Sequence, residues 1–284
     1  MPKKRSNNDV FGHEQVAASG HKTRNVLKDD FGLDIPSELV PLPSNGKVYP
    51  EGNSLHGKQA LEIRPMTARE EDILTSRALI KKGVVITELI RSCLIDKSIN
   101  PDDMVAGDRN AVMTSLRITG YGSDYSADVT CPSCSETTKQ DFDLTSLPIK
   151  RLEVEPDSPG ENLFTYELPY TKKKISFKLL DGKDEREIAK VQERTKKSSA
   201  GASKLITLRY RHQILAVDGV TDKTKIQFFI RNMPARDSRA LRKHIDGMEP
   251  GIEMKNWMDC PMCGESSEVR MPLGASFFWP DAAT

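Results

Sequence analysis

The chain has 284 residues, enough for a sizeable core and for two modules. Its formal charge of +1 gives no global electrostatic case for nucleic-acid or membrane binding, and no stretch approaches the ~20 apolar residues of a membrane span. Hydrophobic content of 37% and aromatic content of 6% are low for a compact enzyme, which suggests long exposed segments or surfaces completed by other subunits. The basic start lacks an apolar signal core, so we expect a protein of the reducing cytoplasm.

The N-terminal part of the chain is expected to be extended. Residues 1–30 are polar and without sustained periodicity, which predicts a flexible basic arm. Its Lys3-Lys4-Arg5 cluster could contact nucleic acid, although a solvated tail is the simpler interpretation. Residues 31–65 carry five prolines between short apolar pieces, and proline biases its neighbours toward extended backbone. We therefore expect 31–65 to form a proline-rich strap across a surface, with a turn at Gly46.

A small helical unit is predicted over residues 66–125. Thr67 and Glu70 have the spacing of a capping box, so a helix should begin there and continue until Gly83 ends it. The next helix carries an apolar stripe at i, i+3, i+4, i+7 and i+8 that includes Cys93. This cysteine is therefore expected to be a small core residue rather than a functional thiol.

The following helix and a long insertion complete the predicted elements. Residues 108–120 have the pattern of a third helix of the unit. The insertion, residues 148–251, has its own order of strands and helices. Apolar residues alternate on both sides of a polar turn over 164–179, which predicts a hairpin. Asp184 and Glu187 offer a second capping box that would open a charged helix, and two shorter helices should follow.

Two C-P-x-C turns carry the strongest chemical signal. Their cysteines are Cys131, Cys134, Cys260 and Cys263. A C-x2-C turn points two thiolates at one centre, and two such turns supply the tetrahedral set that closes a structural zinc site. We therefore predict one structural Zn²⁺ ion in a zinc-ribbon-like module whose halves, residues 126–147 and 252–275, are split by the insertion.

The spacing of the two pairs leaves alternatives. Compact zinc ribbons usually have about 15–20 residues between the pairs, whereas more than a hundred intervene here. Two independent redox motifs would need a helix directly after each pair, and neither turn leads into a strong helical pattern. Two disulfides, one within each pair, would close only very small loops. The zinc interpretation is thus preferred, on the condition that the fold brings the pairs together.

The sequence contains no recognisable catalytic motif. The five histidines show no paired metal spacing, and there is no Gly-x-Ser-x-Gly, Walker or dinucleotide motif. Acidic residues outnumber basic ones around both C-P-x-C turns, whereas phosphate-contacting surfaces need clustered Lys and Arg. We therefore expect that the protein is not an enzyme and that it binds nucleic acid weakly or not at all.

Five short segments follow one another in a recognisable order. They are LPSNGKVY (42–49), IRPMTAREEDIL (63–74), FKLLDG (177–182), NMPARDS (232–238) and FFWP (277–280). Their order resembles that in the baseplate hub proteins of T-even-like contractile-tailed bacteriophages. The resemblance covers about residue 35 to the end and leaves the basic arm outside. It implies a non-enzymatic protein that builds or forms the baseplate hub, with other tail hub proteins as partners. It also implies a place in the virion tail baseplate, in the host cytoplasm during assembly, or both.

The C-terminal tail, residues 276–284, is expected to be a docking element. Phe277, Phe278 and Trp279 lie consecutively, so no single helix or strand face can bury all three. Aromatic anchors of this kind dominate interface energetics when they enter a pocket. The alternative is that Trp279 folds back onto the chain as a local plug.

The sequence as a whole predicts an α+β protein. It combines an extended N-terminal arm, a small helical unit and a four-cysteine zinc-ribbon-like module split by an α+β insertion. The preferred function is a structural or assembly protein of a phage baseplate hub. The alternatives are a zinc-ribbon protein of transcription or RNA handling and, less favoured, a metal-dependent enzyme.

Overall fold

The computed structural model describes residues 25–28, 34–196, 205–271 and 277–278. Most of the predicted basic arm, residues 1–24, therefore lies outside the described residues, as do the aromatic Trp279 and the residues after it. Residues 25–28 of the arm form a strand that pairs with residues 34–36.

Helices and strands both contribute to the fold, as predicted. The described strands are β1 (Asn25–Lys28), β2 (Asp34–Pro36), β3 (Glu38–Pro41), β4 (Ala60–Ile63), β5 (Asp124–Thr130), β6 (Thr137–Asp143), β7 (Ile149–Lys150), β8 (Phe164–Glu167), β9 (Lys174–Phe177), β10 (Ile214–Val217), β11 (Gly251–Ile252), β12 (Lys255–Asp259) and β13 (Ser266–Arg270). The described helices are α1 (Ala68–Thr75), α2 (Arg77–Lys82), α3 (Val85–Cys93), α4 (Ala106–Tyr121), the 3-10 helix η1 (Leu144–Ser146), α5 (Gly182–Lys196), α6 (Leu205–Gln213), α7 (Lys223–Asn232) and α8 (Ala235–Met248).

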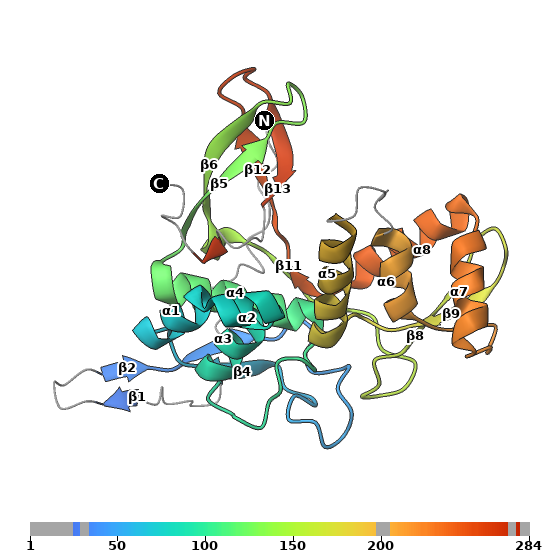
Figure 1. Cartoon of the computed structure of the whole chain (residues 1–284), viewed down its shortest axis with the longest axis horizontal. Coiled ribbons are helices and arrows are strands. Elements are labelled where there is room, and N and C mark those ends of the chain that lie inside the picture. Colours follow the sequence, from blue (N-terminus) through green and yellow to red (C-terminus); the bar gives the residue numbers. More distant parts are fainter. Residues whose placement is uncertain (1–24, 29–33, 197–204, 272–276, 279–284) are drawn as a thin grey trace.

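Figure 1 shows three parts around the long helix α4. Helices α1 to α4 and the antiparallel pair β3–β4 form the helical unit. Two hairpins, β5–β6 and β12–β13, project side by side from it although they are far apart in sequence. We call them the first and second cysteine hairpins. The insertion lobe, which holds β8 to β10 and α5 to α8, extends to the other side. The cysteine hairpins and the insertion lobe are thus separate projections from one base.

The proline-rich strap is tied to α4 by a buried carboxylate. Asp108 accepts hydrogen bonds from the backbone N–H of Ser44 at 2.8 Å and from the hydroxyl of Tyr49 at 2.6 Å. Burial raises the pKa of Asp108, and it also raises the pKa of Tyr49 well above its usual value. Gly46, between these contacts, has φ +70°, and a Cβ there would lie 2.4 Å from the backbone nitrogen of Lys58. These contacts explain why a turn with glycine follows Pro43-Ser44.

The first helix of the unit begins as predicted but ends earlier. The capping box of Thr67 and Glu70 is present, and the carboxylate accepts from the Thr67 N–H at 3.0 Å. The backbone then leaves the helical region at Ser76 (ψ 104°), so the expected single helix is two short ones, α1 and α2. Gly83, with φ 68°, ends α2 and has the left-handed conformation typical of such a cap.

Glu70 also anchors the end of the strap. Its carboxylate is fully buried and makes a bidentate ion pair with Arg64 at 2.6 and 2.9 Å. The hydroxyl of Ser92 in α3 donates to the same carboxylate at 2.6 Å. Burial raises the pKa of Glu70, but Arg64, Ser92 and Thr67 outweigh burial and hold the pKa at about 2. One carboxylate thus joins the strap, α1 and α3.

This pKa predicts a pH-dependent stability. Because the pKa of Glu70 is below its ordinary value of 4.5, its contribution is complete above about pH 4.5 and is lost as the pH falls toward 2. Replacing Glu70 by Gln should lower the free energy of unfolding at pH 7 by about 3 kcal/mol, and the difference should shrink below pH 4.5. Urea unfolding of both proteins between pH 7 and pH 3 measures this difference in the free energy of unfolding. Asp72→Asn, an exposed substitution in the same helix, is the control. A loss of stability that is the same at every pH would contradict the low pKa of Glu70.

The insertion lobe packs its helices against a three-stranded antiparallel sheet in the order β10-β9-β8. The hairpin β8–β9 is the one predicted over 164–179. Its turn is held by Asp237 of α8, which accepts from the backbone N–H of Tyr170 at 2.8 Å and of Thr171 at 3.0 Å. The capping box of α5 differs from the prediction: Asp181 accepts from the N–H of Asp184 at 2.9 Å, one turn before the expected box.

A continuous core runs through all three parts. It includes buried side chains of the strap, the helical unit, both cysteine hairpins and the lobe, and Cys93 belongs to it as predicted. Burial raises the pKa of Cys93 to about 12. Among the described residues, no helix has the length and apolar character needed to cross a membrane.

Candidate metal centre

The two C-P-x-C turns have the same backbone geometry. At the tip of the first cysteine hairpin, the N–H of Cys131 donates to Glu136 O at 2.8 Å, and the N–H of Ser135 donates back to Cys131 O at 2.9 Å. At the tip of the second, Cys260 N–H donates to Glu265 O at 3.0 Å, and the N–H of the next glycine donates to Cys260 O at 2.8 Å. The two tips are therefore repeats of one local structure.

A left-handed residue follows the second cysteine of each pair. Ser135 has φ 63° and Gly264 has φ 72°. This conformation favours glycine, and for other residues it costs about 1–2 kcal/mol. In the first turn Ser135 adopts this left-handed conformation although serine disfavours it. Both turns therefore have the same backbone conformation.

The hairpins meet because each presents an apolar face. Strand side chains alternate between two faces. In β5, Tyr125, Ala127 and Val129 are buried, while the residues between them are exposed. In the second cysteine hairpin, Met258 and Val269 are buried in the same way. All five side chains belong to the common core. Packing of these faces places the two cysteine tips next to each other.

The four cysteine sulfur atoms all lie within 4.8 Å of one another. The Sγ atoms of Cys131 and Cys263 are 3.8 Å apart, and those of Cys134 and Cys260 are 3.7 Å apart. All four thiols are free, and these distances far exceed the ~2.05 Å of an S–S bond. The expectation that the two pairs meet at one centre is confirmed, so they are not independent motifs. The cluster could bind a metal ion.

The surroundings shift the pKa values of Cys260 and Cys134 in opposite directions. Backbone N–H groups of Cys263 and Met262 lower the pKa of Cys260 to about 7. The amide of Glu136 lowers the pKa of Cys134, but desolvation and the three neighbouring cysteines outweigh it and raise this pKa to about 12. One thiolate therefore forms easily, whereas further negative charges in so small a volume are unfavourable unless a cation compensates them.

Two of the three predicted docking side chains are buried in this chain. Phe277 is 0% exposed and Phe278 is 1% exposed. The Phe277 ring lies edge-on to Tyr125 of β5, with ring centroids 5.3 Å apart. This burial differs from the expectation that both rings are exposed for a partner. The reason is that the two rings pack edge-on against each other, with centroids 5.3 Å apart, and both join the common core. Trp279 lies outside the described residues.

A buried arginine fixes the tail in this position. Arg117 of α4 is 0% exposed, and its Nε donates to the carbonyl of Phe277 at 2.8 Å. The other guanidinium nitrogens donate to the carbonyls of Gly122 at 2.7 Å and Asp124 at 2.9 Å. Burial lowers the pKa of Arg117. The side chain thus joins the end of α4, the start of the first cysteine hairpin and the C-terminal tail.

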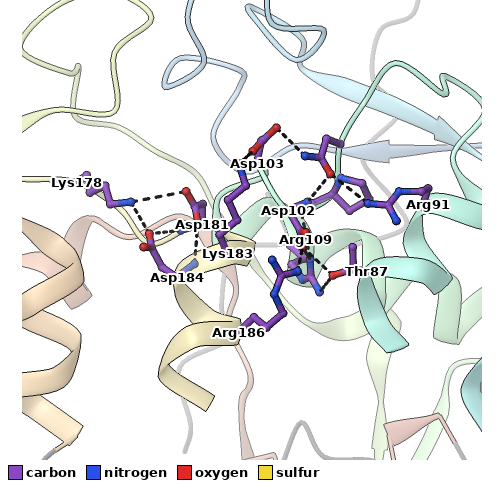
Figure 2. Close-up of polar contacts among 12 residues, drawn as sticks. Thr87, Arg91, Asp102, Asp103, Arg109, Lys178, Asp181, Lys183, Asp184 and Arg186 are labelled. Carbon is purple, nitrogen blue, oxygen red and sulfur yellow. Dashed lines mark hydrogen bonds and ion pairs between the residues drawn. The ribbon is translucent and has the colours of Figure 1, made fainter. Parts of the chain in front are cut away.

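Figure 2 shows a second polar cluster, between the helical unit and the start of α5. Asp102 accepts from Arg186 Nη1 at 2.6 Å and from the hydroxyl of Thr87 at 2.9 Å. Arg109 Nη2 donates to the same hydroxyl at 3.0 Å, and Lys183 forms an ion pair with Asp103. Burial raises the pKa of Asp102, but Arg186 and Thr87 outweigh burial and lower it.

This cluster holds the insertion lobe against the helical unit. Its acids come from the loop before α4, and its lobe-side cations come from α5. Sequence reasoning missed it, because charged residues eighty or more positions apart look like ordinary solvated side chains. The one local signal is the Asp-Gly-Lys-Asp segment at 181–184, where α5 begins.

The fold and the thiol cluster define a mixed helix-and-sheet protein with one four-cysteine centre that could bind a metal ion. The chain belongs to the family described as "T4 bacteriophage base plate protein", whose model matches residues 38–279. The resemblance seen in the sequence is thereby confirmed. The family indicates a structural protein of the phage tail baseplate that contacts other tail proteins. A search of the curated proteins and a search of the solved structures gave no match.

Proposed function

We propose that this protein is a non-enzymatic structural or assembly subunit of the baseplate hub. It acts through protein–protein contacts, and its four cysteines hold one structural Zn²⁺ ion in a zinc ribbon. The observation that carries the proposal is the cluster of four sulfur atoms from two hairpins that are more than a hundred residues apart. Membership of the baseplate family supports the tail location.

The donor set fits zinc. A regular tetrahedron with Zn–S bonds of about 2.3 Å has sulfur–sulfur edges of about 3.8 Å. The Cys134–Cys260 distance of 3.7 Å and the Cys131–Cys263 distance of 3.8 Å agree with this value. Four thiolates complete the coordination shell, so no position is left for a reactive water. The ion would therefore supply rigidity and charge compensation rather than catalysis.

Metal analysis tests the site directly. We expect the purified protein to contain one equivalent of zinc by inductively coupled plasma mass spectrometry, with the four thiols protected from alkylation until a chelator is added. The simultaneous variant Cys131→Ser and Cys263→Ser should contain less than a tenth of the zinc. Protein without metal and with all four thiols freely titratable would contradict the proposal.

The hub assignment is tested in infected cells. A tagged copy of the chain should co-purify with other proteins of the tail, because hub subunits act within that assembly. The alternative is a nucleic-acid-associated zinc ribbon. It is less favoured because exposed Asp and Glu surround both cysteine tips, as Asp128, Glu136, Asp259 and Glu265 illustrate. Recovery of polymerase subunits or RNA in place of tail proteins would support that alternative.

A further inference from the structure

Charge is unevenly divided along this nearly neutral chain. The insertion, residues 148–251, contains 22 Lys and Arg against 15 Asp and Glu, a formal charge of +7. The whole chain carries +1, so the remaining residues carry −6. A protein with charges of opposite sign on its two parts has an electrostatic reason to meet an oppositely charged surface at each of them.

A row of exposed basic side chains lies on the outer face of α8. Arg236, Arg239 and Lys243 are exposed and follow one another at i, i+3 and i+7, and Arg242 is exposed beside them. We call these four residues the basic stripe. In the described part of the chain, no ion pair joins them to a carboxylate within 4.0 Å. Asp237, between Arg236 and Arg239, is buried and bound to the β8–β9 turn. Asp246, the exposed carboxylate of α8, lies beyond the stripe near the C-terminal end of the helix.

A group of exposed acidic side chains lies on the outer face of the first cysteine hairpin. Its exposed positions include Asp124, Asp128, Asp141 and Asp143, which we call the acidic face, with Lys139 as its one basic residue. The strand register places Asp124 directly opposite Asp143. Asp128 is opposite Lys139. The buried side of the same strands packs into the core, so these carboxylates all point away from it.

Each surface keeps some like charges next to each other: Arg239 is three or four residues from the other members of the basic stripe, and Asp124 lies opposite Asp143. Like charges at i, i+3 and i, i+4 destabilise a helix by about 0.2–0.5 kcal/mol per pair. Like charges directly opposite each other in an antiparallel pair are also unfavourable. A partner of opposite charge turns both repulsions into attraction. The stripe spans about 10 Å along α8 and Asp124 to Asp128 about 13 Å along β5, so the two surfaces match in length.

The two surfaces cannot reach each other within one chain. The first cysteine hairpin projects from the helical unit, while α8 lies in the insertion lobe on the other side (Figure 1). The polar cluster around Asp102 ties that lobe to the helical unit. From this geometry and charge we propose that the chain associates head to tail, with the basic stripe of one copy against the acidic face of a second copy. The contact is heterologous, so each copy keeps one free surface for a further copy.

Salt dependence is the first test. Sedimentation velocity of the zinc-loaded full chain is measured at 100 µM protein in 50 mM and in 500 mM NaCl. At low salt the weight-average mass should be at least twice the monomer mass of 31.7 kDa, and at high salt it should approach the monomer mass, because exposed charges are screened. A monomer at low salt, or a salt-independent oligomer, would overturn the proposal.

Charge reversal tests the two surfaces separately. One variant carries Arg236→Glu, Arg239→Glu and Lys243→Glu, and a second carries Asp124→Lys and Asp141→Lys. Each should be monomeric alone, because both of its surfaces then carry the same sign. An equimolar mixture should associate again at low salt, because the unchanged stripe of the second variant meets the unchanged acidic face of the first and the two reversed surfaces also attract each other. Association of either variant alone at the wild-type level, or a mixture that stays monomeric, contradicts the model.

A matched control separates surface specificity from net charge. Arg77→Glu, Lys81→Glu and Lys82→Glu reverse three exposed cations on α2 and change the net charge by the same amount as the stripe variant. This control should associate like the wild type. The melting temperature and zinc content of every variant are measured to confirm folding. If the wild type stays monomeric but binds single-stranded RNA or DNA through the basic stripe, nucleic acid is its ligand and the head-to-tail proposal is wrong.

Discussion

Replacing Cys260 by Ser is expected to loosen the whole region from residue 126 to 275. The four sulfur atoms come from two hairpins that no covalent bond joins, and the free energy of binding a structural zinc ion becomes free energy of folding. Apparent values for such sites are about 10–16 kcal/mol, as large as the whole stability of an ordinary domain. We therefore expect a loss of more than ~5 kcal/mol and a collapse of amide protection in both cysteine hairpins.

The measurement is thermal unfolding combined with hydrogen exchange of β5, β6, β12 and β13. Met262→Ser is the matched control, because this exposed side chain lies in the same turn and is not one of the four thiols. The control should melt within a few degrees of the wild type. Treatment of the wild type with a strong chelator should reproduce the Cys260→Ser phenotype. An unchanged melting temperature of Cys260→Ser would show that the cluster does not hold the hairpins together.

Local patterns in the sequence predicted local structure well. The C-P-x-C spacing, the capping box of Thr67 and Glu70 and the alternation over 164–179 all correspond to features of the fold. Each depends on residues a few positions apart, whose backbone geometry is set by the same short-range sterics and hydrogen bonds in any protein. Even the meeting of the two cysteine pairs could be anticipated, because two thiolates alone do not close a tetrahedral site.

Long-range polar contacts could not be predicted. The third helix was expected to begin after Asp108, but α4 begins at Ala106 and Asp108 lies in its first turn. The Asp108 carboxylate faces Ser44 and Tyr49, which are more than fifty residues away in sequence. Arg117 is another case, since nothing in the sequence marks it as fully buried among three backbone carbonyls. His244 stacks on Tyr166 with ring centroids 4.1 Å apart, a contact that no local sequence pattern indicates. The residues that a charged side chain contacts are set by the tertiary fold, and they cannot be identified from a single sequence.

The C-terminal tail gives the second large expected effect. Deleting residues 277–284 removes two fully buried phenylalanines, and truncating a buried Phe typically costs about 3–5 kcal/mol. It also removes the carbonyl that accepts from Arg117 Nε and leaves a buried charged donor without that partner. Together these losses reach the total stability of many domains. We expect the truncated chain to be largely unfolded at 25 °C.

A second truncation separates folding from docking. Deleting only residues 279–284 keeps Phe277, Phe278 and the carbonyl bound by Arg117, so the chain should keep its urea midpoint. Trp279 is the remaining candidate for docking, and the shorter deletion should then fail to join hub complexes in infected cells while it stays folded. Full assembly by this variant would end the docking proposal for Trp279. A folded chain after deletion of 277–284 would contradict the structural role of the two phenylalanines, because their burial beside Tyr125 and Arg117 is what makes the tail part of the core.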